Sequence, residues 1–206
     1  MNGLWLINED IGIIKQHYYT WLQKKFHFDS WHIVPINQRQ YAIDIIYYLN
    51  KQIITKNGYI VEVGCGLGDI IGNINYPTRK KIGLDKDLRV ISGAKAANPF
   101  RAIYKVGSFD NINQKKISLL ITVNFIHNIE PTELKHIYMK ICKENCIERI
   151  VLDVVKSKNY LYNHNGEYLL KDLGYTRAMS SRPYRVKDGI RKVEVWERND
   201  IYEKRF

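Results

Sequence analysis

The segment Val61–Gly68, with the sequence Val-Glu-Val-Gly-Cys-Gly-Leu-Gly, constrains the fold of this chain more than any other segment. An apolar run leads directly into three alternating glycines, and a helical pattern follows. Glycine adopts backbone angles that other residues avoid, so the chain can turn tightly here and bring its amide groups close to a ligand. The segment therefore predicts a buried strand, a tight turn and the start of a helix.

From Gly58 onward, short apolar runs alternate with helical patterns, which is typical of a parallel sheet covered on both faces. The last two predicted strands are too close together for a helical crossover, so we expect them to be antiparallel. Pro131 and Gly174 stand where a helix is expected to begin and where a later one is expected to end. The predicted strands cover 59–63, 81–84, 102–106, 118–122, 149–154, 175–180 and 190–198, and the helices 69–74, 88–97, 131–145 and 166–173.

The first fifty residues predict a helical cap. Apolar residues at three- and four-residue spacing indicate one helix, and a second is expected over 37–51. The residues that set the spacing are Ile11, Ile14, Tyr18, Trp21 and Leu22. The aromatic segment 26–35 between the helices either fills the core or lines a pocket.

Composition limits the class of protein. The 206 residues suit one domain, and their hydrophobic content of 45% is that of a folded chain. The net charge of +11 favours an anionic partner, although the abundance of Ile, Lys and Asn can produce such a charge without selection for one. Three cysteines give neither a disulfide framework nor a zinc-binding spacing. Apolar runs of about ten residues are too short to span a membrane, and Met1–Asp10 does not resemble a signal peptide, so we expect a cytoplasmic protein.

Two acids distinguish the glycine segment from a dinucleotide-binding loop. The glycines follow a G-x-G-x-G spacing, and Glu62 precedes the first of them by two residues. Asp85 ends the second strand about 20 residues further on, where a carboxylate can accept hydrogen bonds from both hydroxyls of a ribose. With these residues in place, the sequence from Gly58 to Arg198 resembles the class I S-adenosylmethionine-dependent methyltransferases.

The resemblance implies an α/β fold with a seven-stranded, mostly parallel Rossmann-like sheet, one antiparallel strand and helices on both faces. With the N-terminal helical cap that the spacing predicts, we expect a single methyltransferase domain over 1–206, with the cap at 1–52 and the cofactor-binding core at 53–206. S-adenosylmethionine would be the cofactor. Ser108 departs from the family pattern, which carries an acid there. The implied cofactor-binding residues are Glu62, Gly64, Cys65, Gly66, Gly68, Asp85, Lys86, Ser108, Phe109 and Asn124.

Catalytic residues are expected after the carboxyl ends of the strands, where ligands bind in open α/β sheets. His127 is the first candidate for a general base, with His32 and Asp153 behind it, although a lone histidine in an apolar stretch is often only structural. No metal ligands are predicted. The segment 180–192 is basic and would suit an anionic acceptor, or it is simply a solvated hairpin. The predicted substrate-binding residues are Trp31, Arg39, Tyr41, Asn128, Tyr162, Arg182 and Arg185.

Three functions remain open. The first is O-methylation of a small-molecule or saccharide-like acceptor, including anionic or phosphorylated ones. The second is methylation of RNA on a ring nitrogen or a ribose; this is not favoured, because Asn124-Phe125-Ile126-His127 differs from the Asn-Pro-Pro-aromatic pattern of exocyclic amine methylases and no separate RNA-binding module is visible. The third is a non-catalytic protein that binds S-adenosylmethionine. The sequence does not indicate the oligomeric state.

Overall fold

The structure is a computed structural model that describes residues 9–52, 57–187 and 189–199. The expectation about a signal peptide at Met1–Asp10 and the predicted domain boundary at residue 53 fall largely outside these ranges. The chain forms two compact units: unit 1 comprises residues 1–54 and 65–108, and unit 2 comprises 55–64 and 109–206. The prediction of one domain divided at residue 53 stays a prediction.

Unit 1 contains the two predicted cap helices, α1 (Glu9–Phe26) and α2 (Gln40–Lys51), separated by the short 3₁₀ turns η2 (Ser30–Ile33) and η3 (Ile36–Gln38). Its other part contains α3 (Asp69–Gly72), η4 (Thr78–Lys80), β2 (Lys81–Asp85), α4 (Leu88–Ala97) and β3 (Ile103–Val106). Strands β2 and β3 pair in parallel, as expected for strands joined by a helix. Asp87 starts α4 because its carboxylate accepts a hydrogen bond from the Arg89 amide at 2.8 Å.

The core of unit 1 explains part of the aromatic segment. Phe28 is only 2% exposed and packs in one cluster with Tyr19, Leu22, Leu67 and Val90, so this aromatic side chain fills the core. The spacing in the sequence predicted α1 correctly. The face that this spacing marks is nevertheless exposed: of the residues that set it, Leu22 is buried, whereas the other four are all more than a third exposed.

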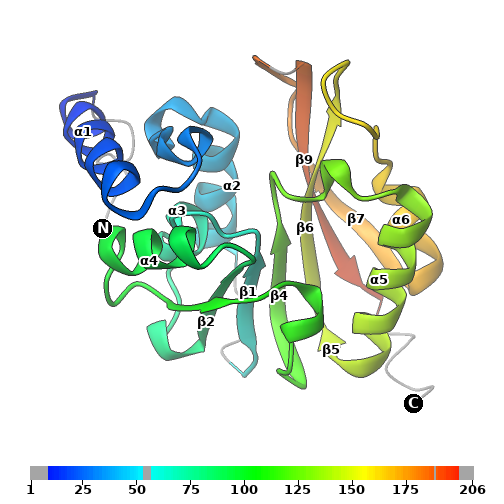
Figure 1. Cartoon of the computed structure of the whole chain (residues 1–206). Helices are drawn as coiled ribbons and strands as arrows, with labels where there is room; N and C mark the ends of the chain where they lie inside the picture. The colour runs from blue at the N-terminus through cyan, green and yellow to red at the C-terminus, as the bar shows by residue number, and fades with distance from the viewer. Residues whose placement is uncertain (1–8, 53–56, 188, 200–206) are drawn as a thin grey trace. The chain divides into compact units, whose positions relative to one another are not determined.

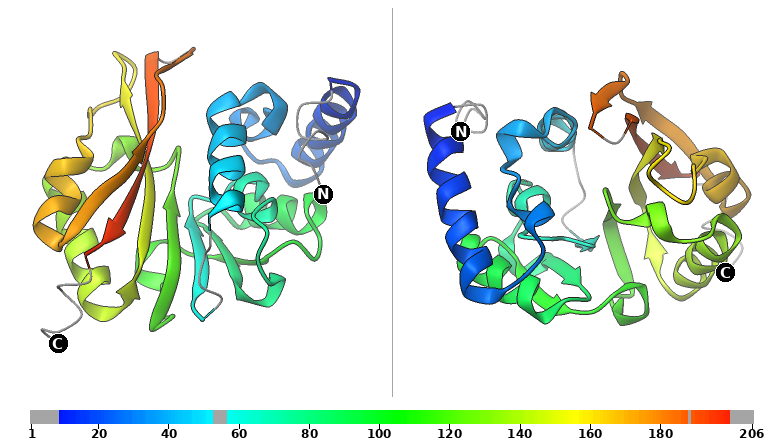
Figure 2. Two further views of the ribbon diagram at one scale, coloured as in Figure 1. Left: turned by 180° about the vertical axis from the view of Figure 1, so that it is seen from behind. Right: turned by 45° about the horizontal axis from the view of Figure 1, so that its top comes forward.

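Unit 2 contains β1 (Tyr59–Val63), β4 (Lys116–Thr122), β5 (Cys146–Ile147), β6 (Arg149–Lys156), β7 (Tyr175–Ser180), β8 (Tyr184–Val186) and β9 (Gly189–Arg198). Its helical segments are η5 (Phe109–Asn111), η6 (Ile126–Asn128), α5 (Pro131–Glu144), α6 (Gly166–Leu170) and η7 (Lys171–Leu173). Helices α5 and α6 lie side by side along the sheet (Figures 1 and 2).

The sheet of unit 2 has the predicted mixture of directions. Strand β4 pairs in parallel with β1 and with β6, whereas β9 runs antiparallel to both β6 and β7. All seven predicted strands form: five in this unit and two, β2 and β3, in unit 1. The α/β class, the mostly parallel order and the single reversed strand, β9, are therefore confirmed. The short strands β5 and β8 were not predicted, and β8 adds a small hairpin to β9.

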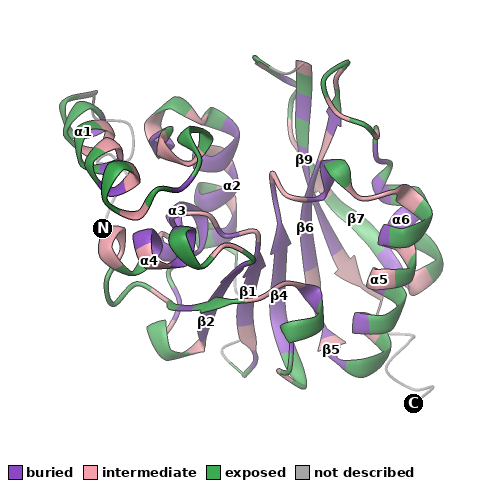
Figure 3. Ribbon diagram, in the orientation of Figure 1, coloured by how far each residue is buried: buried purple, intermediate pink, exposed green. Residues whose placement is uncertain are grey.

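Burial and capping follow from local sequence. The central strands of unit 2 are largely buried (Figure 3), and every residue of β4 after Lys116 is buried, as expected for a strand covered on both faces. Pro131 occupies the first turn of α5, and the side chain of Glu130 accepts a hydrogen bond from the Glu133 amide at 2.9 Å. Gly174 ends η7 with φ +84°, which confirms the predicted left-handed helix end.

Candidate functional site

The glycine segment adopts a backbone that only glycine accommodates well. Gly64, Gly66 and Gly68 have φ angles of +72°, +54° and +79°, all in the left-handed region. A side-chain carbon at Gly64 would lie 2.3 Å from the ring of Phe125, and one at Gly68 would lie 2.4 Å from the hydroxyl oxygen of Tyr104. Gly64 and Gly68 are therefore required by both backbone conformation and space, and Gly66 by backbone conformation.

Asp85 lies beside this loop, where the sequence predicted it. Its Oδ2 accepts a hydrogen bond from the Gly66 amide at 3.1 Å, and its Oδ1 accepts one from the Asp87 amide at the same distance. The side chain is only 7% exposed. Burial raises the pKa of Asp85, and the two backbone hydrogen bonds oppose part of that rise. The carboxylate is thus fixed at the end of β2, directly against the backbone of the loop.

The loop is open at Gly66. Among the described residues, a side-chain carbon there would meet only the His32 imidazole, whose Nδ1 would lie 3.3 Å away. Burial lowers the pKa of His32 to about 4, so its imidazole is neutral near pH 7 and a weak base. Trp31, its neighbour, is 57% exposed. In unit 1, the Asp85 carboxylate therefore contacts the glycine loop through a hydrogen bond from the Gly66 amide, and the His32 imidazole lies next to Gly66.

The other predicted cofactor residues occupy different environments. Glu62, Cys65 and Phe109 are buried, and the Phe109 ring packs 5.8 Å from that of Phe125, measured between centroids. Ser108 is partly buried and Lys86 is exposed. The roles of these residues stay predictions.

Asp69, which the sequence reasoning missed, is a buried acid of unit 1 with several side-chain partners. It directly follows the third glycine, is 3% exposed, and accepts a hydrogen bond from the Tyr19 hydroxyl at 2.7 Å. It forms ion pairs with Arg39 and with Lys15, the latter at 3.5 Å. An acid at the start of a helix in a basic chain was the available signal. Arg39, predicted to bind substrate, is thus paired with Asp69, and Tyr41, predicted likewise, is buried in α2.

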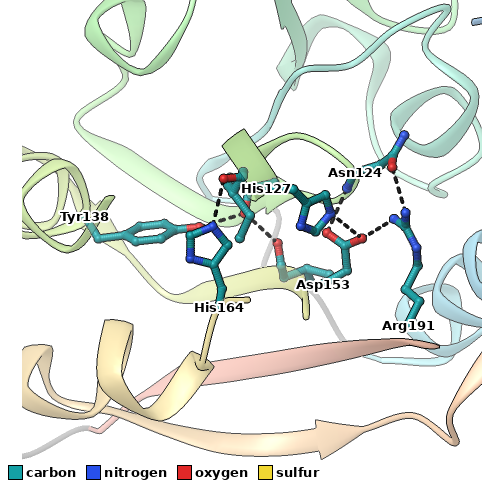
Figure 4. Close-up of polar contacts among 9 residues, drawn as sticks. Asn124, His127, Tyr138, Asp153, His164 and Arg191 are labelled. Atoms are coloured by element: carbon teal, nitrogen blue, oxygen red, sulfur yellow. Dashed lines mark hydrogen bonds and ion pairs between the residues drawn. The ribbon is translucent and has the colours of Figure 1, made fainter. Parts of the chain in front are cut away.

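A second group of polar residues lies in unit 2, at the carboxyl end of β4 and along β6 and β9 (Figure 4). Asp153 of β6 is fully buried; its Oδ1 accepts a hydrogen bond from the Asn124 amide at 2.8 Å, and its Oδ2 contacts His127 Nε2 at 3.2 Å. Arg191 of β9 forms a buried ion pair with the same Oδ2 and donates from Nη2 to Asn124 Oδ1 at 2.9 Å. We call these four residues the Asp153 network.

Electrostatics in the Asp153 network favour an ionised carboxylate. Burial alone would raise the pKa of Asp153, but the charge of Arg191 and the hydrogen bonds from His127 and Asn124 hold it below its ordinary value. Asn124 has a φ of +60°, a conformation that asparagine tolerates better than most residues, and its two bonds hold it there. The network therefore places a fixed carboxylate, a fixed amide and one imidazole at one edge of the sheet.

His127 is held in one tautomer by this arrangement. A carboxylate only accepts hydrogen bonds, so the neutral imidazole carries its proton on Nε2 and leaves a lone pair on Nδ1. Nδ1 has no hydrogen-bond partner among the described residues, and the side chain is only 3% exposed. The Tyr160 ring lies 4.6 Å from the imidazole, measured between centroids. Close by, His164 donates from Nε2 to the Ile126 carbonyl at 2.9 Å, and burial lowers its pKa.

The basic segment predicted to bind an anionic acceptor divides into two kinds of residue. Arg182 and Arg185 are exposed, and the guanidinium of Arg182 lies 5.5 Å from the centroid of the Tyr184 ring. Arg191, in contrast, is 3% exposed and committed to Asp153. Asn128 is exposed in η6, and Tyr162 is partly buried.

None of the helices in the described ranges has the length and apolar character to cross a bilayer. Within the same ranges, no three His, Cys, Asp or Glu side chains come together in a way that could hold a metal ion.

Comparison with known proteins gives matches in structure only. No family model matches the sequence, and no curated protein matches it either. Magnesium protoporphyrin IX methyltransferase (ChlM) from Synechocystis PCC 6803, solved with S-adenosylmethionine, matches with a TM-score of 0.66 and 13% identity over 91% of this chain and 96% of ChlM.

Two further solved structures have similar folds. The methyltransferase domain of a bacterial Hen1 matches with a TM-score of 0.58 and 10% identity over 79% of this chain and 98% of that domain. WbdD matches with a TM-score of 0.58 and 16% identity over 78% of this chain and 40% of WbdD. The chain therefore has the fold of the class I methyltransferases that bind S-adenosylmethionine.

Proposed function

We propose that this chain is an S-adenosylmethionine-dependent methyltransferase that transfers a methyl group to an oxygen of a small or saccharide-like acceptor carrying anionic groups. One observation carries the assignment: Asp85 ends β2 against a loop of three left-handed glycines, on a methyltransferase fold. A carboxylate suits the hydroxyls of a ribose, and backbone amides suit the charged amino-acid end of the same ligand.

The residues of unit 1 fit such a cofactor. The backbone at Gly66 is open except for His32, and the Asp85 carboxylate makes two backbone hydrogen bonds, which leaves lone pairs for ribose hydroxyls. Cys65, Lys86 and Ser108 complete the proposed binding set of unit 1, and the cofactor-binding roles of Glu62, Phe109 and Asn124, which belong to unit 2, stay predictions. When bound, S-adenosylmethionine supplies a methyl group already activated on a sulfonium.

Within unit 2, His127 is the proposed general base. Asp153 fixes the imidazole with its proton on Nε2, so Nδ1 can accept the proton of an acceptor hydroxyl as the methyl group is transferred. Asp153 is then a positioning residue. Because Arg191 shares the same carboxylate oxygen, Asp153 stabilises the imidazolium less than an unshared carboxylate would. We therefore expect the contribution of His127 to lie at the low end of the usual range, roughly 10² in rate.

Asn124 supports oxygen as the methylated atom. Its side-chain oxygen already accepts a hydrogen bond from Arg191 at 2.9 Å, so the outward group of the amide is its NH₂ donor. A donor suits a hydroxyl, carboxylate or phosphate oxygen, whereas an amine to be methylated would need an acceptor. The exposed Arg182 and Arg185 add positive charge for an anionic acceptor.

RNA is the second candidate acceptor, on the strength of the net charge of +11. The same residues would then methylate a ribose hydroxyl or a ring nitrogen.

A non-catalytic protein that binds S-adenosylmethionine is the third candidate, since His127 is nearly fully buried. A methyl-transfer screen with S-adenosylmethionine and three acceptor classes separates the candidates: sugar nucleotides, phosphorylated metabolites and RNA.

The first prediction concerns cofactor binding. Calorimetric titration of the full chain with S-adenosylhomocysteine should show binding, and titration with NAD should show none. Asp85→Ala should weaken that binding by at least about tenfold, because it removes charge-assisted hydrogen bonds worth roughly 1.5–3 kcal/mol each. The matched control is Asp87→Ala, which removes the cap of α4 two residues away and should leave the affinity unchanged. Equal affinity in the wild type and Asp85→Ala would remove the ribose assignment, and absence of binding would sink the proposed function.

A further inference from the structure

Helix α1 carries apolar residues on two faces, one buried in the core of unit 1 and one largely exposed. Tyr19 and Leu22 are buried in the core of the unit. The other face exposes Ile14 at 68%, Trp21 at 51% and Tyr18 at 39%. Ile11, 37% exposed, extends it. Single exposed apolar side chains are common, but Ile11, Ile14, Tyr18 and Trp21 recur every three or four residues and so share one face of the helix, and contiguous exposed apolar faces usually mark an interaction site.

The patch is ordered along the helix. Ile14, Tyr18 and Trp21 follow the four- and three-residue spacing by which one helix packs along another. The Tyr18 ring stacks on that of Trp21 with centroids 5.9 Å apart, and the Tyr18 hydroxyl donates to the Ala96 carbonyl. These contacts hold the aromatic side chains in place before any partner binds, which lowers the entropic cost of docking.

The two ends of α1 carry opposite charges. Asp10, at the start of α1, is exposed, and Lys24 and Lys25 are exposed in its last turn. Two copies of α1 packed in parallel would place acid beside acid and lysine beside lysine. Two antiparallel copies would place the acid of each beside the lysines of the other, so the charges complement only in the antiparallel arrangement.

We propose that this face of α1 docks on the same face of α1 in a second copy of the chain, in an antiparallel two-fold contact. A single register, centred between His17 and Tyr18, sets Ile14 opposite the partner's Trp21 and Asp10 opposite the partner's Lys25. A two-fold contact uses one surface twice, so its apolar centre and its charged ends must be self-complementary, as they are here. The proposal does not depend on the proposed methyltransferase activity.

Sedimentation of the full chain tests the proposal. Between about 1 and 200 µM the average mass should rise from the 24.3 kDa of one chain toward twice that value. The double substitution Ile14→Glu with Trp21→Glu should keep the protein monomeric over this range. The control is Met139→Glu, which changes an exposed apolar residue of α5 and should self-associate as the wild type does. A thermal melt of each variant confirms that it folds.

A charge swap tests the direction of packing. Asp10→Lys alone and Lys25→Asp alone should each weaken self-association, by about three- to thirtyfold, because each replaces two symmetry-related attractions by repulsions. The two substitutions together restore complementary pairs, and the dissociation constant should return to within about threefold of the wild type. No restoration would rule out the antiparallel register.

Two results overturn the proposal. The first is a mass of one chain at every concentration, or self-association that the Ile14 and Trp21 substitutions do not change. The second is a chain that stays monomeric but co-sediments with phosphatidylserine-containing vesicles, with the binding lost in the same double substitution. That outcome would assign the face of α1 to a lipid surface instead of a second copy.

Discussion

Asp153 and Arg191 form a buried ion pair in unit 2. Both are almost fully buried, and Arg191 also orients Asn124. Asp153→Asn removes the charge and leaves the guanidinium buried without its counter-ion, so we expect the free energy of unfolding to fall by about 3–5 kcal/mol. Urea denaturation measures it. Asp172→Asn is the control, because Asp172 pairs with Lys135 while 74% exposed and should matter by less than about 1 kcal/mol. If the free energy of unfolding fell by similar amounts in both variants, the buried pair would stabilise the protein no more than the exposed one.

The same carboxylate predicts a pH dependence. The folded-state pKa of Asp153 lies below its ordinary value of 3.8, so the folded state binds the proton less tightly than the unfolded state. The resulting stabilisation is complete above the unfolded-state pKa and is lost as the pH falls through the folded-state pKa. The free energy of unfolding of Asp153→Asn should therefore fall less than that of the wild type between neutral pH and about pH 3. Parallel curves for the two proteins would show that Asp153 titrates alike in both states.

His127 gives a prediction for catalysis. His127→Ala should lower kcat roughly 10²-fold and leave the affinity for S-adenosylhomocysteine unchanged, since the proposed role is to accept a proton and not to bind the cofactor. His136→Ala provides the control, because His136 is exposed on α5 and should not alter kcat. Full activity in His127→Ala would leave His127 with a structural role only.

At the scale of elements, Asp69 joins the cap segments to the start of α3. Its partners Tyr19 and Lys15 belong to α1, and its partner Arg39 is the residue immediately before α2. Asp69→Asn should loosen α1, with faster amide hydrogen exchange over 9–26 and a loss of about 3 kcal/mol, because one buried carboxylate neutralises these charges. Asp44→Asn is the matched control in α2, where Asp44 accepts a hydrogen bond from Gln40. Unchanged exchange in α1 would mean that apolar packing alone holds this helix.

Most elements could be predicted from the sequence, since their signals are local. Proline at the start of α5, glycine at the end of η7 and apolar runs in the strands placed the boundaries within a few residues. The short strands β5 and β8 carry too few residues for a pattern. In α1, the spacing predicted a helix but not which of its two apolar faces packs against the core, since that depends on residues distant in sequence such as Leu67 and Val90.

The candidate site divides in the same way. Glu62, the three glycines and Asp85 belong to one local pattern, and the structure places Asp85 on the loop as the sequence predicted. Arg39 was predicted to bind substrate, and Arg191 lies in the segment 180–192, which was interpreted from its charge alone. Their buried partners, Asp69 and Asp153, lie 30 and 38 residues away in sequence, and only tertiary structure shows that these arginines are neutralised.

At the scale of the whole molecule, the two units have interleaved sequences. Unit 1 contains both cap helices and the segment from Cys65 to Ser108, while β1 belongs to unit 2. The two comparisons by sequence found no match, whereas the comparison by structure found several. The chain therefore shares its fold with proteins to which it is only 10–16% identical in sequence. Such low identity is compatible with a shared fold, because few residues determine the strand order and the glycine loop.

The interleaving sets the order in which the chain can fold during synthesis. Strand β1 pairs with β4, which begins only at Lys116, after the last residue of unit 1. A ribosome adds roughly 5–20 residues per second, so β4 is complete about one to three seconds after the last residue of unit 1. Parallel pairing across such a separation is also slow. During translation, the edge of β1 that pairs with β4 therefore stays without that partner until every residue of unit 1 has been made, and this is the edge that a chaperone would shield.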